Sequence, residues 1–431
     1  MKYIVTILIL PIALFLLSPG ILTAQENQDD IEELKKLAPK VYIDCGICDI
    51  DFIRTEITFI NYVRDRKEAQ IHIMITTLST GGGGREYTIA FIGQNEFEGI
   101  NDTQKYFTGR TDTSDEIREG LVKVLKIGLM SYVAKTPIAS KMEISYQEET
   151  QEEEAKDKWN KWVFSLSGRG YLSGEKTYKY HSLYSTFTAA RITTRSKINL
   201  SLSANQSKQT FELEDETLES STESMYLAGS YILGLNDHWS AGLYFRVASS
   251  TYENVDIAFS PSPAIEFNLF PYSESTRRQL RFIYQLNFDA VRYREETIYL
   301  KTQDNLLSES LSINLSLKEK WGSISTSLEG SHYFFDFSKN RMDIFSVINV
   351  NLIKGLSLVA FGGGSRIHDQ LSLVRGGASL EEVLLQRTQL ETSYSYFFSV
   401  GFSYTFGSIY TNVVNPRFGS SGYGGMTVII D

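Results

Sequence analysis

The 431-residue chain is poor in cysteine, proline and net positive charge. It holds two Cys and eight Pro, against 25 Tyr, 25 Phe and 31 Gly. Abundant aromatics and glycine with so little proline favour many long, regular strands over a disordered or collagen-like chain. The 42 Lys and Arg are outnumbered by 52 Asp and Glu, for a net charge of −10. Without a clustered positive surface, a nucleic-acid partner is not expected.

Residues 1–24 have the pattern of a secretory signal peptide. Lys2 precedes the apolar run YIVTILILPIALFLL, and a small-residue cleavage site follows at Ala24. A retained membrane helix fits less well, because no basic residues follow to stop transfer. The residue directly after the cleavage point is Gln25 and not a Cys, so a lipid anchor there is not indicated. The mature chain is expected to begin near Gln25, outside the cytoplasm.

A leader over residues 25–40 precedes a predicted α/β domain over residues 41–144. The predicted order is β-α-β-β-α, with strands VYID, AQIHIMITT and REYTIAFIG. The first helix opens at Asp49 and Asp51 and presents Phe52, Phe59 and Val63 on one face. The second opens at TSDE, where Thr113 and Glu116 have capping-box spacing, and its apolar stripe contains Ile117, Leu121, Val124 and Leu125.

An acidic linker is predicted over residues 145–158. It crowds together five glutamates, Glu148, Glu149, Glu152, Glu153 and Glu154, which repel one another and form no apolar stripe. Residues 26–158 hold 17 basic and 26 acidic side chains, a net of −9, whereas residues 159–431 hold 24 and 26, a net of −2. This change in composition places a domain boundary at the linker.

From residue 159 to 406 the chain alternates apolar and polar residues with period two, which predicts strands with one apolar face. Twelve segments are expected, several as long as the ~9–11 residues that cross a bilayer at a tilt. They cover residues 160–173, 179–193, 196–212, 222–235, 238–253, 257–271, 278–294, 307–319, 322–336, 341–353, 356–373 and 391–406.

The connections between these segments also alternate. Those after the even-numbered segments are tight, as in LNDHW and KEKWG, whereas those after the third, seventh and eleventh are long and polar. An even strand count with short turns at one end and longer loops at the other is typical of a transmembrane antiparallel up-and-down β-barrel. We therefore expect a mainly β protein with a barrel of about 12 strands behind a small α/β domain.

The last predicted strand, YSYFFSVGFSYTF, ends the barrel but not the chain. With the repeated alternation and the turn asymmetry, it makes residues 159–406 resemble bacterial outer-membrane β-barrel proteins. Its outward aromatics, Tyr394, Tyr396, Phe398, Phe402, Tyr404 and Phe406, resemble the terminal signal read by the barrel-insertion machinery of that family. The resemblance implies outer-membrane lipid and this machinery as partners, in a bacterium of the Gram-negative type. Residues 407–431, ending in MTVII, are expected to form a periplasmic tail that pairs with an edge of the amino-terminal domain.

Cys45 and Cys48, in CGIC, form the sharpest local motif. In an oxidising compartment such a pair is a disulfide, a redox couple or half of a metal site. A redox role is disfavoured because no aromatic precedes Cys45, and zinc because the domain has no second Cys pair and only His72. A structural disulfide is favoured, with free thiols and then a metal site as alternatives.

Six charged residues fall on the polar face of their strands and are expected to point into the barrel: Arg169, Arg246, Glu266, Arg281, Asp289 and Glu329. Their mixed signs allow ion pairs that close the lumen or a polar pore lining. Both outcomes stay open, with an occluded lumen slightly favoured.

Catalysis is not expected, although a barrel hydrolase remains an alternative. The barrel segments contain His181, His238, His332 and His368; His181 and Ser182 are adjacent and so point to opposite faces, and Glu295-Glu296 and Glu381-Glu382 fall in predicted loops. The expected function is a non-enzymatic structural or binding role in the cell envelope, in which residues 41–144 engage a periplasmic protein. A diffusion channel for small polar solutes is the first alternative. No cofactor or metal is implied.

Overall fold

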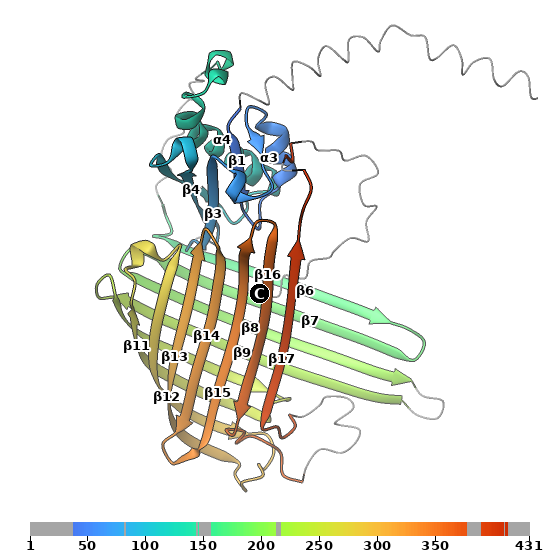
Figure 1. Cartoon of the computed structure of the whole chain (residues 1–431). Coiled ribbons are helices and arrows are strands. Elements are labelled where there is room, and N and C mark those ends of the chain that lie inside the picture. The colour runs from blue at the N-terminus through green and yellow to red at the C-terminus, as the bar shows by residue number, and fades with distance from the viewer. Residues whose placement is uncertain are drawn as a thin grey trace, which may run out of the picture.

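The computed structural model describes residues 38–81, 83–143, 145, 157–212, 217–376, 389–408 and 410–412. The predicted signal peptide, nearly all of the leader and the acidic linker, and the MTVII segment of the tail lie outside the described residues. Two bodies are seen in the described part, a small α/β module and a large antiparallel sheet (Figure 1).

The module is built on a five-stranded sheet in the order β2-β1-β3-β4-β5. Its strands are β1 (Lys40–Asp44), β2 (Asn61–Tyr62), β3 (Ile71–Ser79), β4 (Arg85–Gly93) and β5 (Asn101–Thr108). β1 runs parallel to β2 and β3, and the remaining pairs are antiparallel. The helices are α3 (Ile50–Glu56) and α4 (Ser114–Val133), with short 3₁₀ turns η3 (Arg66–Glu68), η4 (Asn95–Phe97) and η5 (Pro137–Lys141).

Helix α4 begins and packs as its sequence predicts. The Thr113 hydroxyl accepts a hydrogen bond from the Glu116 amide at 3.2 Å, and the Glu116 carboxylate accepts one from the Thr113 amide at 2.7 Å. This reciprocal pair satisfies two amides that the first helical turn leaves free. The buried stripe of α4 lies on the module's sheet and contains Leu121, Val122, Leu125, Leu129, Tyr132 and Val133. In the described part of the chain, no helix is long and apolar enough to cross a bilayer.

Two features of the module differ from the sequence expectation. Helix α3 ends at Glu56, so Phe59 and Val63 lie beyond it and the prediction that they share its face was wrong. Thr55, Ile57 and Thr58 are β-branched residues with low helix propensity, and the backbone of Ile57 is already outside the helical region. Strands β2 and β5 were not predicted, because β2 has only two residues and β5 (NDTQKYFT) is mostly polar.

The large sheet contains twelve strands in strict chain order, which confirms the predicted antiparallel meander. Its strands are β6 (Trp162–Gly174), β7 (Tyr178–Ile192), β8 (Ser196–Glu212), β9 (Thr217–Gly234), β10 (Trp239–Ser250), β11 (Val255–Asn268), β12 (Arg278–Tyr293), β13 (Gln303–Glu319), β14 (Gly322–Tyr333), β15 (Asp336–Ile353), β16 (Leu356–Ile367) and β17 (Tyr394–Tyr404). A short 3₁₀ turn, η6 (Tyr272–Glu274), lies between β11 and β12.

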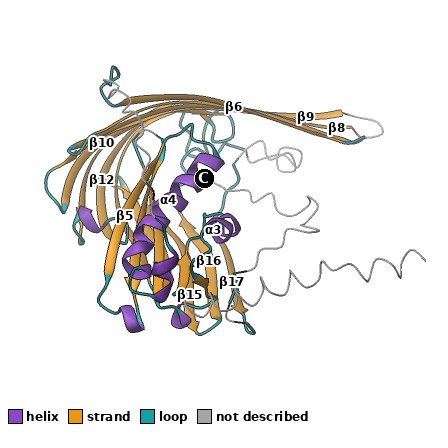
Figure 2. Cartoon of the chain, turned by 90° about the horizontal axis from the view of Figure 1, so that it is seen from above, coloured by secondary structure: helices purple, strands orange, loops and turns teal. Residues whose placement is uncertain are grey.

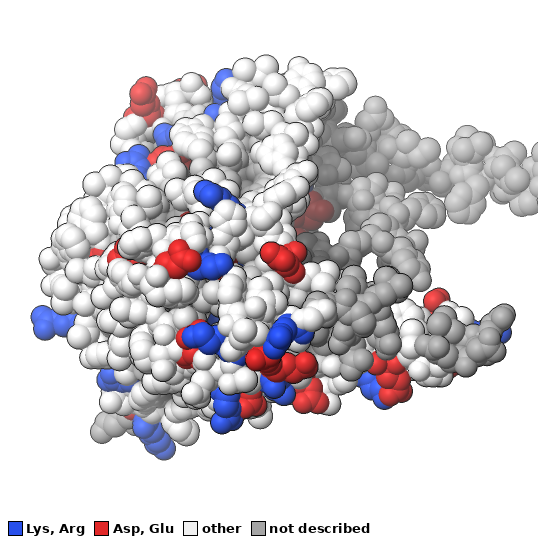
Figure 3. All heavy atoms as spheres, turned by 90° about the horizontal axis from the view of Figure 1, so that it is seen from below, with Lys and Arg blue, Asp and Glu red and all other residues white. Residues whose placement is uncertain are grey.

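Two of the three predicted long connections are found, after β12 and after β16. The third was wrong, because only four residues separate Glu212 of β8 from Thr217 of β9. Pairing continues to Glu212 and Thr217 at the ends of these strands, and the Lys208–Glu219 ion pair at 2.8 Å joins the two strands. Seen from the end opposite the module, basic and acidic side chains are intermixed (Figure 3).

The sheet curves into an arc that does not close, and the module lies at one end of it (Figure 1). Among the described strands, β6 and β17 each pair on one side only, with β7 and β16. The views from the side and from above both show the ends of β8 and β9 extending away from β17 (Figures 1 and 2). The strand number and order are therefore those of the predicted barrel, whereas the pairing of first with last strand is not made.

The two faces of the arc differ in chemistry. Register partners share a face, so the alternation can be followed from β6 to β17. On the convex face, ten strands expose large apolar side chains, while Leu328 of β14 and Leu358 of β16 are half-buried. One example from each of the ten is Leu166, Phe187, Leu202, Tyr231, Leu243, Ile265, Leu286, Leu311, Ile344 and Phe402.

We expect the module to lose stability in alkali. Burial raises the pKa of Tyr132 from its ordinary value of 10.0 to about 12 and that of Tyr42 to about 12. The Tyr132 hydroxyl donates to the Ile100 carbonyl at 2.8 Å. A pKa raised by folding stabilises the folded state fully below the unfolded value, and this contribution is lost as the pH rises from about 10 to about 12.

Tyrosinate absorbance and protease sensitivity of the module, followed together over this pH range in the full chain, check the expectation. Tyr132→Phe should move the loss of protease resistance to higher pH, because one group that must ionise is gone. An unchanged midpoint in this variant contradicts the assignment.

Candidate functional site

The concave face of the sheet holds the main candidate site, a polar cavity of about 380 Å³. It is lined by β9 to β14 and by Asp369, which reaches it from the connection after β16. Serine and amide side chains dominate the lining, and they include Ser260, Ser262, Ser308, Ser310, Ser331, Gln285 and Asn287.

The strand register places all six predicted lumen charges on the concave face, but at three separate positions. Arg246, Asp289 and Glu329 line the cavity. Glu266 and Arg281 form an ion pair at 4.0 Å near the β11–β12 turn, where Glu266 also accepts a hydrogen bond from Tyr272. Arg169 lies apart from them on the edge strand β6.

Much of the hydrogen-bonding capacity in the cavity is not used by the protein. In the described structure, the side chains of Ser262, Ser308 and Ser310 make no hydrogen bond, nor do those of Gln285 and Asn287. The Arg246 guanidinium lies 4.7 Å from the centre of the Tyr226 ring. Polar groups of this kind need water or a solute as partners, so the cavity is suited to a polar content.

Two concave-face features were missed from sequence. Arg341 pairs with Asp343 at 2.7 Å and with Asp369 at 3.7 Å, which ties the long connection after β16 to β15. The parity of β15 was a signal for Arg341 and Asp343, but nothing in the sequence pointed to Asp369. A cluster of Phe345, Phe361 and Phe397 also lies on this face, with Phe397 6.2 Å and 6.4 Å from the other two ring centres.

The module lies across the end of the sheet that carries the short turns (Figure 2). The β15–β16 turn contacts η3 and its cap: Lys354 pairs with Glu68, and the Gly355 amide donates to the Asp65 carboxylate at 2.6 Å. On the opposite side, the module's β3–β4 hairpin reaches β7, since a Cβ on Gly81 would lie 2.6 Å from that of Ile192. The contacts thus reach two well-separated parts of the rim.

The segment after β17 also contacts the module. Tyr410 forms an antiparallel bridge with Val63, beside the edge strand β2. The Thr411 amide donates to the Tyr62 carbonyl at 2.9 Å, and the Asn412 side chain accepts from the Tyr62 amide at 2.7 Å. The contact occurs at residues 410–412, whereas MTVII, on which the expectation of edge pairing rested, lies outside the described residues.

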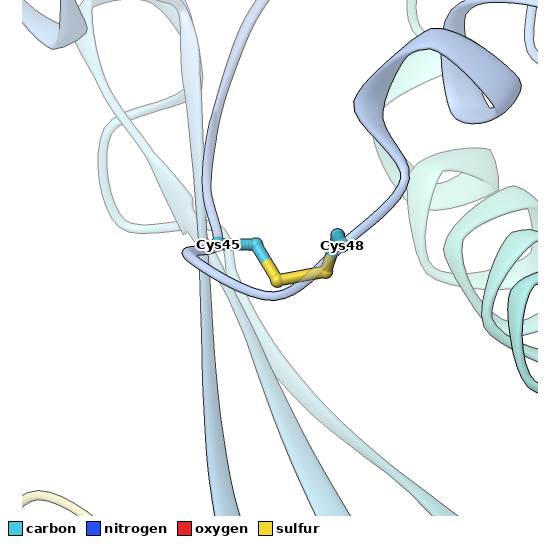
Figure 4. Close-up of a disulfide and its surroundings, with 2 residues drawn as sticks. All are labelled: Cys45 and Cys48. Carbon is cyan, nitrogen blue, oxygen red and sulfur yellow. A yellow bond between two sulfur atoms is a disulfide. The ribbon is translucent and has the colours of Figure 1, made fainter. Parts of the chain in front are cut away.

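Cys45 and Cys48 are joined by a disulfide in the loop between β1 and α3 (Figure 4). Their Cα atoms are 5.6 Å apart, and both side chains pack against the module's core. This loop borders a second cavity, of about 280 Å³, between the module and the β13–β14 turn. Among the described residues, no cluster of three or more His, Cys, Asp or Glu is placed to hold a metal ion.

The residues weighed for catalysis are spread over the sheet. His181 lies on β7, His238 in the β9–β10 turn and His368 just after β16. Glu296 pairs with Arg375 at 2.5 Å, and Glu381 and Glu382 lie outside the described residues. Of these four histidines, His332 is the one that contacts an acid within the described structure: its Nε2 lies 2.9 Å from Glu309 Oε1. The sequence pattern did not point to Glu309.

The terminal-strand aromatics lie on the convex face. Tyr396, Phe398 and Phe402 of β17 are more than 70% exposed, as is Phe406 just beyond the strand. Tyr394 and Tyr404 are also exposed.

No protein-family model and no curated protein matches the chain. Several solved structures resemble it weakly. A NanC porin is 10% identical over 56% of this chain and 99% of its own, with a TM-score of 0.27. The translocator domain of the autotransporter NalP from Neisseria meningitidis is 13% identical over 57% of this chain and 87% of its own, with a TM-score of 0.23. At these scores, neither likeness defines the arrangement or the role of this chain.

We expect a double variant, Val63→Cys with Tyr410→Cys, to form a disulfide. Paired residues on neighbouring antiparallel strands have Cα atoms about 4.5–5.5 Å apart, which suits a disulfide. Such a link closes a very long loop and should speed migration on a non-reducing denaturing gel. Glu98→Cys with Tyr410→Cys is the control, because Glu98 lies in a different part of the module. Equal linking in both variants contradicts the observed contact.

Proposed function

We propose that the chain is an integral outer-membrane β-barrel protein with a non-enzymatic structural or binding role in the cell envelope. The observation that carries this is the convex face, where large apolar side chains are exposed on nearly every strand. Water-soluble proteins rarely expose continuous apolar areas beyond a few hundred Å². A second sheet packed on this face would bury it, but in the described structure the face is uncovered. Lipid acyl chains are the environment in which such an exposed apolar face is stable.

The strand lengths support this proposal. At a tilt of about 40°, each residue adds about 2.6 Å of height, so twelve residues span roughly 30 Å. The shortest strand, β17, has 11 residues and the longest have 18. Every strand is therefore long enough to cross an apolar band of about 25 Å.

Closure of the barrel belongs to the proposal. Unpaired amides and carbonyls within lipid cost several kcal/mol each, so an open sheet does not persist in a bilayer. β6 and β17 are the two unpaired edges, and they run in opposite directions because the meander has an even number of strands. Antiparallel pairing between them would satisfy both edges.

The proposed orientation places the module, the short turns and the carboxyl-terminal segment in the periplasm. It is supported by the contacts that bring all three to one end of the sheet. The module's outer edge, β5, pairs with β4 alone in the described structure. We propose that the module engages a periplasmic protein while it covers the barrel mouth.

Fractionation of the mature protein tests the barrel. It should stay with the envelope until detergent is added, and its gel mobility should shift on heating, because a folded barrel resists unfolding by detergent at low temperature. A protein that is soluble without detergent and shows no heat-dependent shift would remove the basis for the proposal.

A diffusion channel for small polar solutes is the second candidate, favoured by the unused polar groups in the concave cavity. Its opening would require the module to leave the mouth. We expect low ion conductance for the wild type in planar bilayers and a rise for Lys354→Glu, which sets two acids against each other at Glu68.

Lys320→Glu is the matched control for this conductance measurement. Lys320 lies in the β13–β14 turn and makes no ion pair in the described structure. No conductance in any of the three proteins favours the closed scaffold over the channel.

A further inference from the structure

The convex face contains a polar cluster near one edge of its apolar band, formed by Tyr284, Glu309 and His332. His332 Nε2 lies 2.9 Å from Glu309 Oε1, and the Tyr284 hydroxyl donates to Glu309 Oε2. These residues come from three adjacent strands, β12, β13 and β14. The direct cross-strand pairing of Glu309 with both Leu286 and His332 places the cluster on the apolar face.

Apolar side chains surround the cluster along the strands. The cross-strand pair Phe288–Leu307 lies toward the end with the long connections, and Leu311 lies toward the module. Leu307 and Leu317 bound the outward apolar run of β13 and are separated by about 26 Å of height at the tilt used above. Glu309 is then roughly 5 Å inside this band, near the level where acyl chains join their head groups.

Ionisable side chains on a lipid face are uncommon and often functional, and their cost falls from the bilayer midplane toward the interface. An isolated pair that only holds two strands in register has little advantage, because apolar residues of similar size are often as stable. The pair is only partly shielded: the side chain of Glu309 is 29% exposed and that of His332 30%. Phe337, whose ring centre is 4.7 Å from that of His332, forms one wall of the site.

The free groups of the cluster are acceptors. When His332 is neutral and Nε2 donates to Glu309, its Nδ1 carries a lone pair, and this atom is buried without a partner in the described structure. Each Glu309 oxygen receives one bond and has capacity for another. Asn340, opposite His332, does not supply a donor, because its amide nitrogen donates to the carbonyls of Phe337 and Ser338.

From this chemistry and depth we infer that Tyr284, Glu309 and His332 form a binding site for a polar lipid that carries N–H or O–H donors near its acyl chains. The inference rests on the proposed membrane location. An ammonium head group or the hydroxyls and amides of a glycolipid meet the requirement. A choline head group has the same charge as an ammonium but no N–H, so it does not.

Native mass spectrometry of the full-length, delipidated protein tests the site. The probes are phosphatidylethanolamine, phosphatidylcholine and lipopolysaccharide, matched for acyl chains where the chemistry allows. A hydrogen bond to a charged group contributes about 1.5–3 kcal/mol, so wild type should retain a donor lipid over phosphatidylcholine by a factor of about ten or more. Comparing phosphatidylethanolamine with lipopolysaccharide shows whether the donor is an ammonium head group or the hydroxyls and amides of a glycolipid.

Glu309→Gln should reduce this preference to near unity. Glu309→Leu should do the same and keep the fold, because an apolar residue suits a lipid-facing position. Glu223→Gln is the matched control, since Glu223 is on the same face of β9 but contacts Gln206 and no histidine. Equal retention of all three lipids by wild type, or an unchanged preference in both Glu309 variants, overturns the inference.

The heat-dependent mobility shift separates the two possible failures. If the shift is present and no lipid preference is found, the lipid site is wrong and the barrel stands. If the shift is absent, the membrane location itself is wrong.

Discussion

The structure depends on one constraint, that a strand paired on both sides can satisfy its backbone while presenting two different faces. The twelve strands satisfy this constraint by pairing in chain order. Residues paired across the strands therefore carry apolar side chains on one face and Ser, Asn, Gln and charged side chains on the other. A slip of one residue in any strand would exchange its faces. The apolar convex face and the polar cavity are therefore two results of the same hydrogen-bond ladder.

The same constraint explains the position of the module. Short turns at one end of a meander form a rim of backbone and polar groups. Asp65 and Glu68, beside η3, and the β3–β4 hairpin of the module contact this rim. The module's two-residue edge strand β2 is covered by residues 410–412, so the end of the chain protects an edge near its beginning. The fold thereby links the last strand of the sheet to the first domain of the chain.

How well each element could be predicted depended on how local its signal is. All twelve long strands were found from period two alone, because each has enough residues to show it. The capping box of α4 was found because its partners are three residues apart. β5 was missed because a polar edge strand has no apolar alternation. The helix α3 was predicted too long because the low helix propensity of the residues after Glu56 was not taken into account.

The functional sites divide in the same way. Parity identified six concave-face charges, but it did not show that only Arg246, Asp289 and Glu329 share a cavity, or that Asp369 joins them. Glu309 and His332 lie on the apolar face, where they interrupt the pattern that identified their strands. Neither strand alone shows that the two residues meet, and only the cross-strand register does.

The sequence by itself determined the fold class, the number and order of the strands and the face on which each side chain lies, since these follow from residue spacing along one strand. Tertiary structure alone decided which side chains meet, where the module sits and what covers β2. The partners in these contacts are hundreds of residues apart, as for Lys354 with Glu68 and Thr411 with Tyr62. Their approach is set by sheet curvature and strand register, which no local pattern records.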